Sequence, residues 1–357
     1  MNKNIFLYIL VVISLLSCSK NKNHAFDYKQ NVIYVKGEFL LIDQLIGNPY
    51  EIICIDTLLI YHDPYRGNIL SVFDLKNNNF VGRFVSEGQG PNEVIPSRLF
   101  LLQYTQKDIL YMFQSDIATL TTFDIPDFNI SNKIQIGLPT QQRSMGLQRG
   151  KDYYIGIGKF EEGRFKVYNS EVEYLYTGAT YPLKGKGNKG KDIDPGQAFY
   201  TYQGNLCMNP DKNYFAMSCL FSDHIAFYEV KEDEIITLKE YYSYDANIDF
   251  FSSSNNVGGT TRISMGARPK NESVISYTAA YGTASYCYML FNGKTYGETG
   301  KVGSGHYIVV FDWQGNYIKT YNTDYEIRTF CVDENNNCIY ATTKDKNLDP
   351  IIIKFKI

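Results

Sequence analysis

Two glycine-rich segments have the residue types that hold phosphate groups through backbone N–H donors. Residues 88–93 (GQGPNE) lack the third glycine of the GxGxxG pattern, and Pro91 removes one donor. Residues 185–192 (GKGNKGKD) contain GxGxxG and also GxxxxGK, but Asp192 stands where a P-loop has Ser or Thr. Both patterns require a following helix, and no helical periodicity follows here. We interpret the first segment as a crossover between repeated units. The second is a solvated basic loop, for which contact with an anion or acidic glycan stays open.

Histidine and carboxylate residues do not form a recognisable catalytic or metal-binding pattern. His62, His224 and His306 have no second base or ligand at a characteristic spacing, and HExxH, GxSxG and CxxC are absent from the sequence. Residues 192–194 and 333–337 offer oxygen ligands but lack the glycine and terminal glutamate of a calcium loop. We expect no metal, no cofactor and no assignable catalytic residue, although a Ser/His/Asp triad assembled from distant segments stays open.

The seven cysteines fall into three groups. Cys18 lies at the end of the N-terminal leader. Cys331 and Cys338 flank one turn and could form a disulfide if the strand register brings them opposite each other. The others stand in apolar, strand-like contexts, where cysteine behaves as a small buried hydrophobe; they are Cys54, Cys207, Cys219 and Cys287.

The leader predicts export and lipid anchoring. Lys3 precedes an apolar run at residues 5–16 that is too short to cross a membrane, and Leu15-Leu16-Ser17-Cys18 follows at once. This order resembles a bacterial lipobox, which implies a signal peptide at residues 1–17 and acyl chains (palmitate) on Cys18 as membrane anchor. An ordinary signal peptide with a chance cysteine is the alternative. Residues 18–29 read as a flexible tether, whose basic character favours the outer membrane with the chain facing the periplasm.

The elements that must position any site are strands. The chain has 31 Tyr and 22 Phe but a single Trp, and short apolar or alternating runs are separated by Asn, Asp, Gly and Pro. A formal charge of −3 argues against a nucleic-acid partner, which would require a basic excess. We therefore predict an all-β protein.

A repeat organises these strands. One strand type carries an aromatic residue near its end, and the aligned aromatics are Phe73, Phe123, Tyr168, Tyr228, Phe311 and Phe355. Their intervals of 50, 45, 60, 83 and 44 residues suit four-stranded propeller blades, with the excess in two insertions expected to be loops, 181–197 and 244–271. The last unit lacks one strand. We expect residues 31–41 to pair with 351–357 and to close the ring.

These features resemble the six-bladed β-propeller lipoproteins, TolB-like and distantly NHL-repeat-like, of Gram-negative bacteria. The resemblance rests on the lipobox, residues 88–93 and the hairpin 330–341, and it covers one propeller domain at residues 30–357. It implies a binding site on the face around the central channel.

We hypothesise that the protein is a binding or protein-interaction module, a monomer that recognises a protein or glycan of unknown identity. The alternative is a lactonase- or esterase-type hydrolase, or a lyase, at the channel mouth. The tyrosines of residues 199–202 and 277–288 could line a binding face, but we expect them mainly to pack between sheets.

Overall fold

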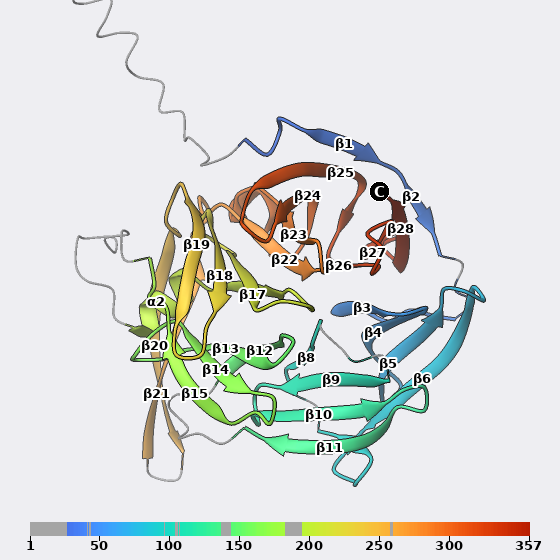
Figure 1. Cartoon of the computed structure of the whole chain (residues 1–357), viewed down its shortest axis with the longest axis horizontal. Coiled ribbons are helices and arrows are strands. Elements are labelled where there is room, and N and C mark those ends of the chain that lie inside the picture. The colour runs from blue at the N-terminus through green and yellow to red at the C-terminus, as the bar shows by residue number, and fades with distance from the viewer. Residues whose placement is uncertain are drawn as a thin grey trace, which may run out of the picture.

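Six antiparallel sheets surround a central channel (Figure 1). The computed structural model describes residues 27–357 except 41, 43, 96, 104–105, 107, 137–143, 183–194 and 258–259; side chains at 195, 253–257 and 260–265 are also left out. The architecture is the predicted all-β six-bladed propeller, with each sheet running from an inner strand at the channel to an outer strand at the rim.

The first three sheets follow the chain in simple order. They are β3 (Glu51–Ile55), β4 (Leu58–Tyr65), β5 (Asn68–Asp74), β6 (Asn79–Glu87) and the short β7 (Glu93–Val94); β8 (Leu99–Leu101), β9 (Ile109–Gln114), β10 (Thr119–Asp124) and β11 (Asn129–Gln135); and β12 (Ser144–Arg149), β13 (Tyr153–Gly158), β14 (Phe165–Asn169) and β15 (Tyr174–Gly178).

The last three sheets contain the additions to the simple pattern. They are β16 (Gly204–Met208), β17 (Tyr214–Cys219), β18 (His224–Val230) and β19 (Ile235–Tyr242); β22 (Tyr277–Gly282), β23 (Tyr286–Phe291), β24 (Gly305–Asp312), β25 (Tyr317–Ile327) and β1 (Val32–Val35); and β26 (Thr329–Val332), β27 (Cys338–Lys344), β28 (Pro350–Lys356) and β2 (Gly37–Phe39). Two short helices, α2 (Pro195–Thr201) and α3 (Tyr296–Thr299), lie in connections.

The repeated aromatic residues mark the third strand of every sheet, as the sequence predicts. All six are at most 3% exposed, and they lie on β5, β10, β14, β18, β24 and β28. In the first five sheets a register shift falls between this aromatic and the residue before it, where the third strand meets the fourth. A bulge at this position increases the local twist, which suits radial packing of neighbouring sheets.

The N-terminal segment contributes to two sheets rather than one. β1 runs parallel to β25, while β2 runs antiparallel to β28. The Leu40 N–H, just after β2, donates to the Ile352 carbonyl at 3.0 Å, so among the described residues the 37–40 part of the predicted 31–41 strand meets the 351–357 segment. Figure 1 shows both strands along the outer edges of the last two sheets. The long β25 offers an edge of its own, and the Asp324 carboxylate accepts a hydrogen bond from the Gly37 N–H at 2.9 Å, where the chain passes from one sheet to the next.

The prediction of a loop at 244–271 is wrong. The segment forms a long antiparallel hairpin of β20 (Ile248–Val257) and β21 (Thr260–Pro269). Ile248 packs in a small apolar cluster with Phe221 and Ile275, which holds the base of the hairpin against the fourth sheet's loops. The sequence does not indicate these strands, because they are rich in Ser and Asn, which have low strand propensity. In the other insertion, α2 occupies the end of the segment, and 183–194 lie outside the described residues.

Cys331 and Cys338 are free thiols in this structure. Cys331 lies opposite Tyr340 in the pairing of β26 with β27, so Cys338 is displaced by two positions along its strand. A diagonal pair of this kind is separated by more than the usual span of a disulfide. The structure therefore does not form the candidate bridge.

Candidate functional site

A cavity of about 240 Å³ occupies the end of the channel where the inner strands begin. Each of the six inner strands contributes to its wall, which combines apolar side chains such as Leu147 and Phe330 with polar groups. Glu51 is the single carboxylate among the described lining residues, and none of them is a histidine.

Glu51 opens β3 and points its carboxylate at the second sheet. The carboxylate accepts a hydrogen bond from the backbone N–H of Leu101. Burial among the channel walls raises the pKa of Glu51 to about 8, and this single hydrogen bond offsets only part of the effect. At neutral pH Glu51 is therefore mostly protonated and can donate a hydrogen bond.

Gln103 forms the floor of the cavity. Its side-chain Nε2 donates to the Ala280 carbonyl at 2.6 Å, and its Oε1 accepts from the Gly282 N–H at 3.2 Å. Its backbone N–H donates to the Gln148 Oε1 at 3.0 Å. Gln103 and Tyr281 also line a second cavity, of about 410 Å³, nearer the opposite end of the channel. These contacts tie three sheets together across the channel and separate the two cavities.

Arg328 stands at the mouth, just before β26. Its Nη1 donates to the Asn48 Oδ1 at 2.6 Å, and its guanidinium lies 4.7 Å from the centre of the Tyr50 ring. The side chain is partly exposed and, among the described residues, has no carboxylate partner. Arg328 can therefore receive an anionic group that enters the mouth.

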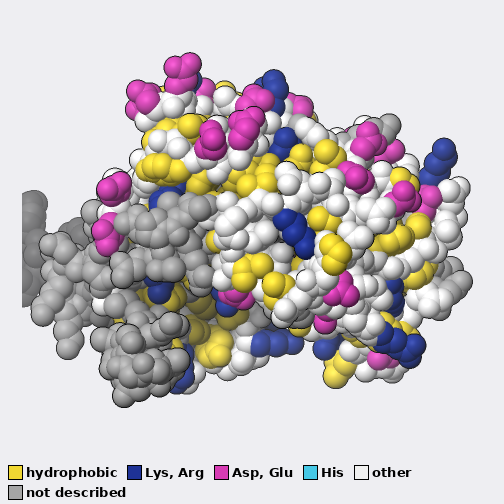
Figure 2. Space-filling model, turned by 90° about the horizontal axis from the view of Figure 1, so that it is seen from below, with side chains coloured by type: hydrophobic (Ala, Val, Ile, Leu, Met, Phe, Trp, Pro, Cys, Tyr) yellow, Lys and Arg dark blue, Asp and Glu magenta, His cyan; other side chains and the backbone are white. Residues whose placement is uncertain are grey.

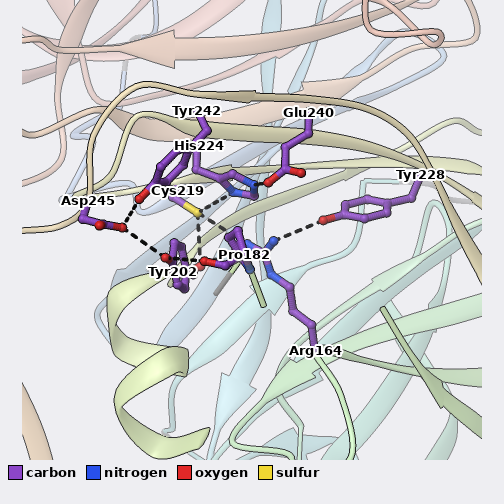
Figure 3. Close-up of polar contacts among 9 residues, drawn as sticks. All are labelled: Arg164, Pro182, Tyr202, Cys219, His224, Tyr228, Glu240, Tyr242 and Asp245. Atoms are coloured by element: carbon purple, nitrogen blue, oxygen red, sulfur yellow. Dashed lines mark hydrogen bonds and ion pairs between the residues drawn. The ribbon is translucent and has the colours of Figure 1, made fainter. Parts of the chain in front are cut away.

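A second polar group lies away from the channel, between the third and fourth sheets; we call it the Cys219 cluster (Figure 3). Cys219 ends β17 and His224 begins β18, so one tight turn brings the sulfur to 3.4 Å from the His224 Nδ1. The His224 Nε2 lies 2.8 Å from the Glu240 Oε1 on β19. Cys219 and His224 are both at most 1% exposed.

Opposing influences act on the ionisation of this pair. Burial by itself would raise the pKa of the Cys219 thiol, but His224 and then Arg164 lower it below its ordinary value. Burial would likewise lower the pKa of His224, yet Cys219 and Glu240 raise it. The geometry favours a thiolate beside an imidazolium.

Arg164 brings a permanent positive charge into the same cluster from the loop before β14. It is 1% exposed; its Nη1 donates to the Tyr228 hydroxyl at 3.1 Å, and its Nη2 lies 3.4 Å from the Cys219 sulfur. No carboxylate of the described residues pairs with it, and its Nε has no hydrogen-bond partner.

Tyrosines and Asp245 complete the cluster. The single proton of the Tyr202 hydroxyl is shared between two acceptors, the Pro182 carbonyl at 2.7 Å and the Asp245 Oδ1 at 3.1 Å. The Tyr242 hydroxyl donates to the same carboxylate oxygen. These bonds connect the segment after the third sheet to the segments before and after the fourth sheet (Figure 3). The Cys219 sulfur lies 3.3 Å from the Tyr202 carbonyl oxygen.

The other residues considered from sequence do not converge on one site. Burial lowers the pKa of His62 to about 4, so it is neutral, and the His306 Nδ1 lies 3.2 Å from the Thr323 carbonyl. In residues 88–93 the Glu93 carboxylate accepts from the Gly90 N–H at 2.8 Å, so the loop holds its own carboxylate where a phosphate would bind. The Asp333 carboxylate caps the turn before Cys338.

Some expected features cannot be located. Cys18 and the basic segment 185–192 lie outside the described residues. Within the residues that the structure describes, no group of three or more His, Cys, Asp or Glu side chains is arranged to hold a metal ion. No helix in this described part is long and apolar enough to cross a membrane.

Sequence reasoning missed the Cys219 cluster because it took Cys219 as a small buried hydrophobe and His224 as a histidine without a base. The available signal was local: Cys219 and His224 flank one hairpin turn, and Glu240 lies on the next strand. No sequence pattern indicated that Arg164 would join this cluster, because Arg164 lies just before β14 of the neighbouring sheet, far from Cys219 in the sequence. Tyr277, Tyr281 and Tyr288 are buried, as expected of packing residues, although Tyr281 also lines both cavities.

Charge on the outer surface does not indicate another site on the side drawn in Figure 2. Acidic side chains gather toward the upper edge of that view, while basic and hydrophobic side chains are interspersed with polar ones. Among the described side chains, this side shows no continuous basic field.

Comparisons with known proteins agree with this architecture. The profile of a family described as TolB-like 6-blade propeller-like matches residues 27–335. The structure of a protein of Bacteroides fragilis described as exported superposes on this chain with a TM-score of 0.52 and 13% sequence identity. The match covers 91% of this chain and 99% of that protein. A DUF4221-family member from Bacteroides vulgatus superposes with a TM-score of 0.55 and 12% sequence identity. This match covers 92% of this chain and 99% of that protein. These two likenesses show the fold alone. No curated protein matches the chain.

Proposed function

The chain belongs to the TolB-like six-bladed propeller family, and from this premise we propose that it is an exported, lipid-anchored binding module. The observation that best supports binding is the polar cavity at the channel mouth, with Arg328 at its rim and a protonated Glu51 on its wall. The cavity lies below the usual size range of drug-like pockets. Its occupant is therefore a small polar molecule, or one side chain inserted by a partner.

The polar groups specify the chemistry of that occupant. Arg328 can pair with a carboxylate, while Glu51 and Gln148 can exchange hydrogen bonds with hydroxyl groups. An acidic sugar combines both features. A binding role is favoured over hydrolysis because Glu51 has neither a second carboxylate nor a histidine beside it among the described lining residues.

A thermal-shift comparison of glucuronate with glucose tests the binding proposal. We expect glucuronate to raise the melting temperature and glucose to leave it unchanged. Arg328→Ala should weaken glucuronate binding by about 10- to 100-fold, because it removes a hydrogen bond to a charged group. Arg66→Ala is the matched control, since Arg66 is an exposed arginine outside the cavity. An equal shift for both sugars, or an unaffected Arg328→Ala, would contradict the proposal.

Anchoring is a separate part of the proposal and rests on the leader sequence ending at Cys18. We propose attachment to the outer membrane with the propeller facing the periplasm. Fractionation of cells that express the full chain should place the wild type in the membrane and Cys18→Ser outside it. Mass spectrometry of the purified protein should find Cys18 acylated at the new N-terminus; an unmodified chain that starts at Met1 would refute the anchor.

A further inference from the structure

We propose that Cys219 is a buried thiolate nucleophile that hydrogen peroxide oxidises, at a site separate from the channel. The proposal rests on the contacts of the Cys219 sulfur with two cationic side chains, His224 and Arg164, at 3.4 Å each. It does not depend on the binding function of the channel or on export.

The charge of Arg164 requires a nearby anion. Arginine stays protonated in proteins, and a charge that leaves water must be compensated. The neutral partners of Arg164 include the Tyr228 hydroxyl and the Tyr202 carbonyl, but no carboxylate of the described residues reaches it. Of the two acids that its guanidinium contacts, the Cys219 thiol is stronger than the Tyr228 phenol, and ionisation of the thiol provides the missing negative charge.

His224 occupies the position of an oriented base. One ring nitrogen faces the sulfur, and the other lies 2.8 Å from the Glu240 carboxylate. A carboxylate in this place fixes the tautomer of the ring and stabilises its protonated form. The proton of the thiol therefore has an acceptor within hydrogen-bond reach, as Figure 3 shows.

The reaction balances with peroxide as the only oxidant. The thiolate sulfur attacks one oxygen of hydrogen peroxide, and the O–O bond breaks. The departing hydroxide takes the proton of the His224 imidazolium and becomes water, which leaves a neutral imidazole and a sulfenic acid, Cys–S–OH. Sulfur is oxidised and peroxide is reduced.

The burial of the sulfur restricts which reagents reach it. Cys219 is 0% exposed, so a water-sized, uncharged oxidant is favoured over a bulky or charged one. The Nε of Arg164, which lacks a partner, provides a spare donor within the cluster for an oxygen atom.

Peroxide treatment of the reduced full chain tests reactivity, with a sulfenic-acid probe and peptide mass spectrometry as the readout. Cys54 and Cys331 serve as internal controls, because both are buried and burial raises the pKa of each thiol. We expect Cys219 to be oxidised at least about 10-fold faster than either control. Glu240→Gln should slow this reaction, whereas Glu234→Gln, on an exposed residue outside the cluster, should not. Equal rates at the three cysteines would overturn the proposal.

A titration of ultraviolet thiolate absorbance tests ionisation without requiring access to the sulfur. The ionisable groups around Cys219 are His224, Glu240, Arg164, Tyr181, Tyr202, Tyr228 and Asp245. At neutral pH Cys219→Ser should remove one thiolate from the spectrum of the folded protein, and the matched variant Cys331→Ser should remove none. A Cys219→Ser spectrum that matches the wild type at neutral pH would contradict the proposal.

A second inference rests on a different pair. The sulfur atoms of Cys207 on β16 and Cys287 on β23 lie 2.8 Å apart across the fourth and fifth sheets, and both residues are 0% exposed. This separation is shorter than a usual hydrogen bond to sulfur and approaches the S–S bond length of about 2.05 Å. We infer that these two cysteines form a disulfide under oxidising conditions.

The oxidant is a small-molecule disulfide such as oxidised glutathione, which reaches both sulfurs while the chain folds, before the sheets bury them. Each thiol loses its proton, the two sulfurs join, and oxidised glutathione is reduced to two glutathione thiols. The bond would join strands separated by 80 positions in the sequence. Export, which the proposed function includes, supplies an oxidising compartment, but the test in solution is independent of it.

Thiol counting in denaturant, after the reduced and unfolded chain has been refolded in the presence of oxidised glutathione, tests the bond. We expect the wild type to lose two titratable thiols, with one peptide pair joining Cys207 to Cys287. Cys207→Ser and Cys287→Ser should each abolish this pair, and Cys54→Ser should preserve it. The full number of free thiols in the oxidised wild type would overturn the inference.

Discussion

At the scale of single residues, burial shifts two acids in opposite directions because their partners differ. Glu51 receives one backbone hydrogen bond and has no cation beside it, so burial raises the pKa of its carboxyl to about 8. Cys219 is buried more completely, yet His224 and Arg164 lower the pKa of its thiol. The neighbouring charges, rather than the degree of burial, decide the direction in which each pKa moves.

The raised pKa of Glu51 predicts that stability falls as the pH rises. The ordinary carboxyl pKa is 4.5 and the folded value is about 8, so the folded chain binds this proton more tightly than the unfolded chain does. Its contribution is complete below pH 4.5 and is lost as the pH rises through 8. Urea unfolding across this window should show a slope of at most about 1.4 kcal/mol per pH unit from this group.

Glu51→Gln should remove this part of the slope, because an amide does not titrate. Glu87→Gln, on an exposed glutamate of β6, is the control and should retain the wild-type pH dependence. An identical slope in wild type and Glu51→Gln would show that the carboxyl is already ionised in the folded protein at neutral pH.

At the scale of elements, each sheet depends on the aromatic residue of its third strand, and the last two sheets also depend on the N-terminal strands. Phe123 represents the first feature, since it is 0% exposed and lies at the bulge between β10 and β11. Gly37 represents the second, since it begins β2 where the chain crosses from β25 to β28.

Phe123→Ala should lower the free energy of unfolding by about 3–5 kcal/mol, because it removes a fully buried ring and leaves a cavity. Asn132→Ala, on the exposed surface of the neighbouring β11, should change it by less than about 0.5 kcal/mol. Chemical denaturation of both variants measures the difference, and similar values would contradict the role assigned to the repeated aromatics.

Gly37→Ala should destabilise the closure of the sixth sheet. A Cβ atom at this position would clash with the buried Ile353 side chain, so that side chain, or one of the two strands β2 and β28, must shift to accept it. We expect a loss of about 1–3 kcal/mol, typical of overpacking. Glu38→Ala, on the next and exposed residue of β2, should cost less than about 1 kcal/mol. Hydrogen exchange of β28 should increase only in Gly37→Ala; unchanged protection there would argue against this contact.

At the scale of the whole molecule, sequence reasoning succeeds where a signal repeats and fails where distant segments meet. The six aromatics recur once per sheet, so the period alone predicts the propeller. The polar sites have no such redundancy. Glu51 meets Leu101 from another sheet, and Arg164 meets Cys219 across 55 positions. Only the folded arrangement of the sheets creates these contacts.

Two local features also escaped the sequence analysis for physical reasons. The hairpin of β20 and β21 is rich in Ser and Asn, which usually mark loops. The N-terminal segment reads as one strand, but Asp324 accepts a hydrogen bond at Gly37 and the segment divides between two sheets. Strand edges elsewhere in the fold decided the second outcome, whereas β20 and β21 pair only with each other among the described strands.

The most direct test of the channel as a binding site is a calorimetric titration with glucuronate below and above pH 8, in the wild type and in Glu51→Gln. Ionised Glu51 would repel the carboxylate, so the wild type should lose affinity as the pH rises through this value, while Glu51→Gln keeps its affinity. No binding by the wild type below pH 8, or the same pH dependence in both proteins, would contradict the account.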